Sequence, residues 1–200
     1  MRRSAVLLLS ILLAAGAVAA RAQVVSAATA RHISITAGGM GSIFQPDFQG
    51  DWPDQTIVPA ANASPFGLFG VGAYVDVEFT HWIQLEAEGR WMRFNQYNKI
   101  YQDNYLIGPR VPVYHFWRSN VYAKALVGYG KMNLGAYPGC AQCNVSGRFT
   151  DIAFGGGMDV KLTKRISIRA VDVEYQYWPQ WFNSTLSPYG ASVGVGYRVF

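Results

Sequence analysis

Two cysteines with C-x-x-C spacing, Cys140 and Cys143, are the residues with the most readily recognised chemistry in this sequence. They fall in a predicted loop that runs from Gly135 to Gly147. A metal site would need further ligands that this loop lacks. A redox role would need a lowered thiol pKa, which an exposed loop rarely provides. We therefore expect a short structural disulfide in an oxidising compartment, and neither a metal ion nor a cofactor.

A histidine and a serine two positions apart, His32 and Ser34, are the strongest hint of a nucleophile with its base. Such a pair needs an acidic partner, and we cannot assemble a complete set from this sequence. The other histidines, His81 and His115, fall in predicted turns and are expected to be solvated. We therefore expect no catalytic residues and a protein that is not an enzyme.

Charged residues recur at every second position, which in a β-strand places them on one face. Most of the 12 acidic residues share the less apolar face of predicted strands with several basic residues. Arg169 and Asp172 fit this face only if one extra residue is inserted at Ala170-Val171, so we predict a bulge there. The predicted charge network consists of Asp76, Glu78, Glu86, Glu88, Arg90, Arg110, Lys124, Asp151, Asp159, Lys161, Arg169, Asp172 and Glu174.

The same alternation predicts eight strands. Each is longer than the ~5–6 residues of a typical globular strand and long enough for a tilted membrane strand, which needs ~9–11 residues. Pro109 and Pro112 lie inside the fourth segment, so a bulge is expected there as well. The predicted strands cover about 31–44, 66–79, 82–94, 101–114, 119–134, 148–162, 165–178 and 187–200.

The connections between these segments alternate in length, long after the odd strands and tight after the even ones. This asymmetry is typical of an outer membrane barrel, with tight periplasmic turns and extended outer loops. Both termini then lie on the periplasmic side. The first long loop, which carries Phe48, Trp52, Ile57 and Val58, is the best candidate for contacting an extracellular protein or ligand.

Composition favours a membrane over water for the apolar face. Only 14% of residues are charged, against ~25% in an ordinary soluble domain, and 50% are hydrophobic. A soluble sandwich or lipocalin gives the same alternation, but the interior of an eight-stranded barrel is just wide enough to be filled by side chains. Glycines on the charged face leave room there for Arg, Lys and Tyr. Aromatic residues near the predicted strand ends, Trp178 and Trp181 among them, suggest girdles at both membrane interfaces. We therefore predict an inside-out barrel, with charges inside and an apolar exterior.

The N-terminus has the pattern of an export signal. Arg2 and Arg3 precede an apolar run over 4–20, and Ala20-Arg21-Ala22 offers a cleavage site. We expect a cleavable signal peptide over 1–22, a linker over 23–30 and a barrel domain over 31–200; an uncleaved N-terminal membrane anchor is the alternative. Without the signal, 17 − 3 = 14 basic residues face 12 acidic ones, which gives no reason to expect nucleic acid binding.

Two stretches resemble the OmpA-like and opacity-protein-like family of eight-stranded outer membrane barrels. One is GGGMDVKLTKRISIRAVDVEYQYW, from Gly155 to Trp178, and the other is LIGPRV, from Leu106 to Val111. The resemblance implies an all-β, eight-stranded antiparallel up-and-down transmembrane β-barrel in the bacterial outer membrane. It also implies a monomer inserted by the barrel assembly machinery. One departure is that the apolar alternation runs out of phase with the terminal Phe200.

Three basic residues, Arg93, Lys131 and Arg148, have the parity of the lipid-facing side at the predicted outer rim. We hypothesise that they contact lipopolysaccharide phosphates, as basic groups at a membrane surface do. The alternative is that they snorkel into the loops.

The function predicted from the sequence is structural or surface-interacting, without catalysis, for a barrel in contact with outer membrane lipid and lipopolysaccharide. A lipid A-modifying outer membrane enzyme is the second hypothesis. A narrow small-solute channel is the third, and a soluble periplasmic barrel is the fourth.

Overall fold

The computed structural model describes residues 33–46, 67–80, 82–94, 100–137, 140–181 and 184–199, with the backbone alone for 134–137, 140–145 and 184. The chain divides into two units, 1–32 and 33–200, and only the second is described. The predicted signal peptide, the linker, His32, the apolar residues of the first long loop and Phe200 lie outside the described residues.

Long β-strands make up nearly all of the described chain. They are β1 (Ser34–Gln45), β2 (Leu68–Glu78), β3 (Gln84–Met92), β4 (Tyr101–Phe116), β5 (Ser119–Tyr137), β6 (Cys140–Lys161), β7 (Ile166–Trp181), β8 (Ser184–Leu186) and β9 (Tyr189–Arg198). Their bounds agree with the eight predicted segments to within a few residues, except at β6. The short β8 is an addition that the alternation did not predict, because three residues are too few to carry a period.

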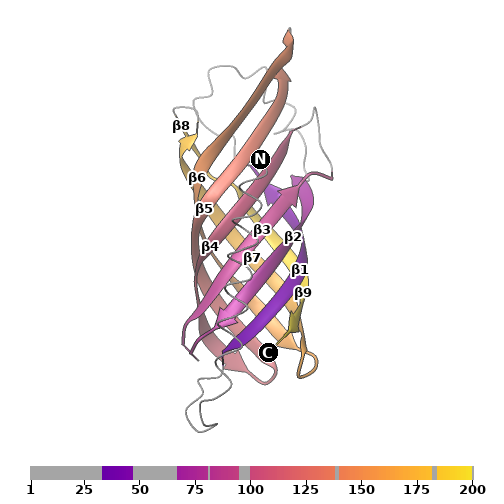
Figure 1. The fold of residues 1–200 in the computed structure, drawn as a ribbon, viewed down its shortest axis with the longest axis vertical. Coiled ribbons are helices and arrows are strands. Elements are labelled where there is room, and N and C mark those ends of the chain that lie inside the picture. Colours follow the sequence, from indigo (N-terminus) through magenta and orange to yellow (C-terminus); the bar gives the residue numbers. More distant parts are fainter. Residues whose placement is uncertain are drawn as a thin grey trace, which may run out of the picture. The chain divides into compact units, whose positions relative to one another are not determined.

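These strands close into a barrel. The order is β6-β5-β4-β3-β2-β1-β9-β7, every neighbouring pair is antiparallel, and β6 also pairs with β7. The eight long strands therefore form a complete cylinder (Figure 1), which leaves no open sheet edge. The first and last strands are neighbours, with Gly39 opposite Val195. The predicted eight-stranded up-and-down barrel is confirmed.

The prediction of a loop from Gly135 to Gly147 is wrong. β5 continues to Tyr137 and β6 begins at Cys140, so the strands extend beyond their neighbours at the end of the barrel with the long connections. The register shifts twice between Asn133 and Tyr137. Beyond the lipid, the outward side chains no longer need to be apolar, although the backbones of the two strands remain paired. The alternation of side chains therefore underestimates the lengths of these strands.

Both predicted bulges are present. β4 runs through Pro109 and Pro112 and shifts register between Pro112 and Tyr114. In the pairing of β7 with β6, Arg169 is opposite Asp159 and Val171 is opposite Met158, so Ala170 is the extra residue. This bulge turns both Arg169 and Asp172 to the buried side.

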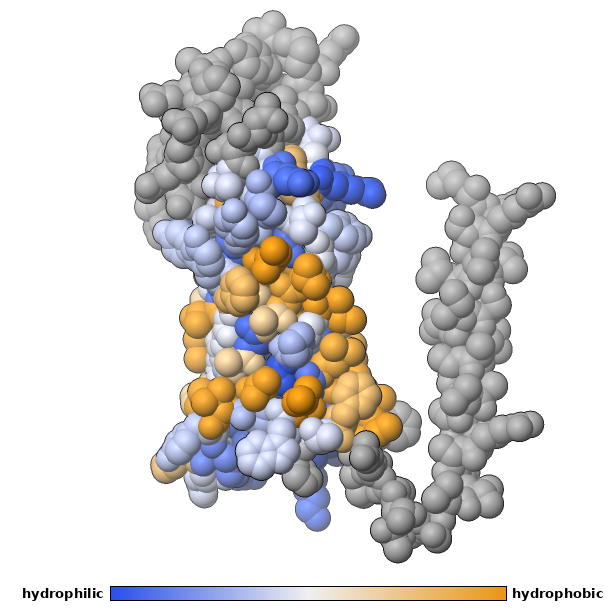
Figure 2. Space-filling model, turned by 90° about the vertical axis from the view of Figure 1, so that its left-hand side faces the viewer, coloured by the Kyte–Doolittle hydropathy of each residue, from blue (hydrophilic) through white to orange (hydrophobic). Residues whose placement is uncertain are grey.

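The alternation of polar and apolar residues along each strand places polar side chains inside the barrel and apolar side chains outside. Glu86, Glu88 and Arg90 are buried, whereas Val75 and Val193 are 40% and 60% exposed. On the face drawn in Figure 2, hydrophobic side chains gather in a belt across the middle of the barrel, between hydrophilic ends. A belt of this kind suits contact with acyl chains. None of the described residues belongs to a helix long and apolar enough to cross a membrane.

Candidate functional site: the charged barrel interior

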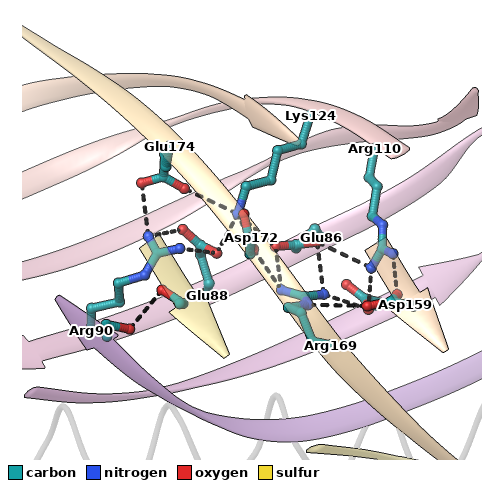
Figure 3. A network of polar contacts seen from close by, with 12 residues as sticks. Glu86, Glu88, Arg90, Arg110, Lys124, Asp159, Arg169, Asp172 and Glu174 are labelled. Atoms are coloured by element: carbon teal, nitrogen blue, oxygen red, sulfur yellow. Dashed lines mark hydrogen bonds and ion pairs between the residues drawn. The ribbon is translucent and has the colours of Figure 1, made fainter. Parts of the chain in front are cut away.

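Ion pairs occupy the middle of the barrel (Figure 3). Inward positions on β2 to β7 supply them, because alternate residues of each strand face the axis. We call this set the charged core: Asp76, Glu86, Glu88, Arg90, Arg110, Lys124, Asp159, Arg169, Asp172 and Glu174.

Two arginines form the layer nearest the short turns. Arg169 donates to Asp76 at 3.0 Å and to Glu86 at 3.0 and 3.2 Å. Arg110 donates to Asp76 at 2.6 Å and also to Asp159. Asp76 thus accepts from both guanidinium groups, and side chains from β2, β3, β4, β6 and β7 meet in one layer. A charge-assisted network of this kind holds the strands in register from inside the barrel.

Lys124 lies at the centre of the charged core. Its ammonium group is 3.2 Å from Glu86, 3.0 Å from Glu88, 2.8 Å from Asp172 and 3.0 Å from Glu174. The carboxylate oxygens of Glu86, Glu88 and Asp172 lie within 4.8 Å of one another, a spacing that could hold a metal ion. The ammonium group of Lys124 contacts all three and supplies the positive charge there.

Arg90 completes the charged core toward the long loops. Its guanidinium donates to Glu174 at 2.8 Å and to both carboxylate oxygens of Glu88. Glu174 also accepts from Gln176 at 2.8 Å. The cation is therefore matched by two carboxylates and is 1% exposed.

The sequence interpretation missed a layer of neutral polar groups above the charged core. Gln102 and Asn104 both donate to Gln176, at 2.9 and 3.0 Å, and Asn104 also donates to Asp151. Asp151, predicted to belong to the charge network, therefore has an amide partner. We call these four residues the amide layer. Their inward parity was readable from the sequence, but an uncharged amide on one face of a strand does not by itself indicate a buried network.

Two inward tyrosines were also missed as partners of the arginines. The guanidinium carbon of Arg110 lies 3.5 Å from the centre of the Tyr122 ring, and that of Arg169 lies 3.6 Å from the centre of the Tyr74 ring. These cation–π contacts fill space beside the ion pairs and shield them.

Toward the long loops, buried apolar side chains lie beside the amide layer and Arg90, and we call them the apolar cap: Phe44, Leu68, Met92, Ile100, Met132, Trp178 and Leu186. This corrects the prediction for Trp178 and Trp181, which were assigned to an interfacial girdle but are 0% and 3% exposed. Trp178 has inward parity and stacks on Phe149 with ring centres 6.0 Å apart. Proximity to a strand end does not decide the face on which an aromatic residue lies.

Glu78 and Lys161 also differ from the prediction. Neither forms an ion pair with another described residue, and Lys161 is exposed. Both line a polar cavity of about 90 Å³ at the end of the barrel that carries the short turns. This cavity is large and polar enough to hold water, so these charges do not need an internal partner.

Arg93 follows β3, Lys131 lies on β5 and Arg148 lies on β6. All three are near the long connections. Lys131 is opposite Asp103 on β4 and opposite Arg148 on β6. Arg93 donates to Asp103 at 2.8 Å. The fold therefore brings the three basic residues together.

Cys140 and Cys143 lie within β6 rather than in a loop. Their side chains are outside the described part of the chain, so the disulfide stays a prediction.

The closed barrel with a buried polar interior can be compared with known proteins. The sequence matches the family described as outer membrane protein beta-barrel domain over residues 10–198. The chain belongs to this family. It is therefore a protein of the bacterial outer membrane, as predicted. The sequence matches no curated protein.

Solved structures agree on the fold. The N-terminal β-barrel domain of Pseudomonas aeruginosa OprF aligns with a TM-score of 0.59 at 10% identity, covering 82% of this chain and 96% of that one. Neisserial surface protein A aligns with a TM-score of 0.52 at 9% identity, with coverage of 82% and 96%. At these identities the likeness concerns the barrel alone.

Proposed function

We propose that this protein is a non-catalytic, non-conducting barrel with a structural or surface-interaction role, which presents its long loops outside the cell. The observation that carries the proposal is the filling of the interior by buried side chains, from Arg110 through Lys124 to Trp178. We expect the protein to be a monomer inserted by the barrel assembly machinery, with lipid and lipopolysaccharide around it.

Closure of the interior argues against the narrow channel. A hydrated ion crossing the barrel would have to displace the apolar cap and separate several ion pairs of the charged core. Breaking one buried ion pair costs about 3–5 kcal/mol. The cavity beside Glu78 and Lys161 at the short-turn end is also lined by Asp76, Arg110 and Asp159, and Arg110 is hydrogen-bonded to both of these carboxylates.

The long connections after β1 and β3, together with the extended ends of β5 and β6, support the orientation. Barrels of this kind have short periplasmic turns and longer extracellular loops. The turns between β2 and β3, β4 and β5, and β6 and β7 are short and lie at the end where β1 begins. One structural neighbour is titled a surface protein, and we extend that role to this chain as a proposal.

Among the described residues, the location of His115 argues against a lipid A-modifying enzyme. His115 is exposed, lies beside the turn between β4 and β5 and is hydrogen-bonded to Asn120. This position is at the short-turn end, on the opposite side of the membrane from lipid A in the proposed orientation. His32, the other candidate base, lies outside the described residues.

Recording from planar lipid bilayers tests the proposal. We expect the purified, folded protein to give no sustained conductance at a concentration at which a general porin inserts readily. A bilayer exposed to detergent alone provides the blank. Stable, repeated openings of the wild-type protein would overturn the proposal in favour of a channel.

A further inference from the structure

A row of charged side chains lies on the lipid-facing side near the long loops, with one residue just after β3 and one each on β4, β5 and β6. We call Arg93, Asp103, Lys131 and Arg148 the rim row. We propose that the rim row binds the phosphate groups of the phosphorylated glycolipid of the outer leaflet, lipopolysaccharide. The inference rests on the proposed orientation of the barrel, with the long-loop end outside.

The cations of the rim row are held together by the fold. Asp103 is only 3% exposed; it accepts from Arg93 and is opposite Lys131 across the ladder. The Tyr101 ring lies 4.6 Å from the Arg93 guanidinium carbon and 5.5 Å from the Lys131 ammonium nitrogen. One carboxylate and one ring thus fix both cations against the barrel wall.

A second row, of aromatic residues, indicates the depth of the rim row in the membrane. Trp91, Tyr105 and Tyr129 lie on the outer face of β3, β4 and β5. Trp91 donates to the Tyr105 hydroxyl at 2.8 Å, and the rings of Tyr105 and Tyr129 stack with centres 5.1 Å apart. Aromatic side chains in such belts lie at the level of the lipid headgroups.

On β4 and β5, and just after β3, each residue of the rim row lies two positions nearer the long loops than the aromatic residue of that strand. Two residues of a strand span roughly 7 Å, so the cations lie just above the aromatic belt, where headgroup phosphates lie. Three cations and one carboxylate leave the row with a net charge of about +2. Arg93 already donates from Nε and Nη2 to the two carboxylate oxygens of Asp103, so Arg148 is the guanidinium group that can bind phosphate with two parallel hydrogen bonds.

The opposite rim of the barrel supplies a matched control. Arg118, Lys164 and Arg165 are three exposed basic residues at the short turns. Arg118 donates to the Leu162 carbonyl and Arg165 to the Tyr197 hydroxyl. Neutralising them changes the net charge of the protein by the same amount, at the end that faces the periplasm in the proposed orientation.

The experiment compares retention of lipopolysaccharide by three full-length proteins in detergent: wild type, R93Q/K131Q/R148Q and R118Q/K164Q/R165Q. Heat-modifiable migration on a gel establishes that each barrel is folded. A basic residue at a membrane surface contributes enough that losing three should weaken binding on the order of tenfold to a hundredfold. Arms with dephosphorylated lipopolysaccharide and with free inorganic phosphate as competitor identify the group that is bound.

We expect R93Q/K131Q/R148Q alone to lose binding, dephosphorylated lipopolysaccharide to bind wild type as weakly as this variant does, and free phosphate to compete poorly. Equal retention by all three folded proteins would overturn the inference and leave the proposed function intact. Loss confined to R118Q/K164Q/R165Q would show instead that the orientation is reversed, which contradicts the proposed function itself. Efficient competition by inorganic phosphate would replace a lipid site with a site for the free anion.

Discussion

Carboxylates outnumber cations among the described interior side chains. Asp76, Glu86, Glu88, Asp151, Asp159, Asp172 and Glu174 face four cations, Arg90, Arg110, Lys124 and Arg169. An interior with more carboxyl groups than cations depends on each cation more than on each carboxyl group. Lys124, which contacts four carboxylates, should therefore be the most sensitive single residue of the charged core.

Replacing Lys124 with methionine tests this dependence with little change in side-chain volume. We expect Lys124→Met to lower the free energy of unfolding by about 3–5 kcal/mol, because four carboxylates lose a shared buried partner. The measurement is urea unfolding of the protein in lipid vesicles, followed by tryptophan fluorescence.

Two further variants make this result specific. Lys161→Met removes an exposed lysine near the cavity and should change stability by no more than about 0.5 kcal/mol. Adding Asp172→Asn to Lys124→Met should recover part of the loss, because one fewer buried charge is left without a partner. If Lys124→Met unfolds at the wild-type urea concentration, the ion pairs do not stabilise the barrel.

At the scale of the elements, glycine lets neighbouring strands and inward side chains approach closely. A Cβ atom on Gly128 of β5 would lie 1.9 Å from the Tyr105 carbonyl oxygen of β4. One on Gly155 of β6 would lie 3.3 Å from the Cε atom of Lys124. The inward glycines therefore do what the sequence predicted, and leave room for large charged side chains.

Alanine substitution at two glycines separates two effects: the steric clash of a new methyl group with a neighbouring strand, and the reduced backbone freedom of the unfolded chain. Gly128→Ala should destabilise the barrel by roughly 1–3 kcal/mol, because the added methyl group overpacks against the backbone of β4. Gly41→Ala, on the outer face of β1 with no atom within 4 Å of the new Cβ, should be neutral or stabilising by up to about 1 kcal/mol. Urea unfolding of both variants under the same conditions checks the difference, and equal effects would contradict the explanation.

At the scale of the whole molecule, the barrel is inverted with respect to a soluble protein. Glu86, Arg169 and Asp172 are 0% exposed, whereas Phe154, Val127 and Val193 are more than half exposed. In water this arrangement would expose an extended apolar surface. In a membrane it satisfies both faces, because lipid covers the apolar belt and each interior cation pairs with carboxylates inside.

A charge placed on the apolar belt tests this arrangement. Val173→Arg, near the middle of β7, should cost about 2–4 kcal/mol of stability in vesicles, and Ile166→Arg, at the short-turn end of the same strand, about 0–1 kcal/mol. Both residues are outward-facing and exposed. A soluble barrel would accept both substitutions equally, so equal stability of the two variants would contradict membrane insertion.

Much of the fold and of its polar interior was predictable, because alternate residues of a barrel strand face the interior and the exterior. Parity placed Glu86, Glu88, Arg90 and Lys124 inside, and the misfit between Arg169 and Asp172 located a bulge. Parity does not reveal which charges meet. Asp151 meets Asn104, and Lys161 faces water, although both share the parity of the ion-paired residues.

The sequence by itself determined the eight long strands, the short turns and the two faces, because a period of two and the turn residues are local properties of the chain. The tertiary structure alone decided which strands close the barrel and how far the strands are staggered. That stagger brings Lys124 of β5 to Glu174 of β7, and Arg93 to Asp103 and Lys131. Ion pairs and the rim row depend on distances between strands, and alternation along one strand contains no information about these distances.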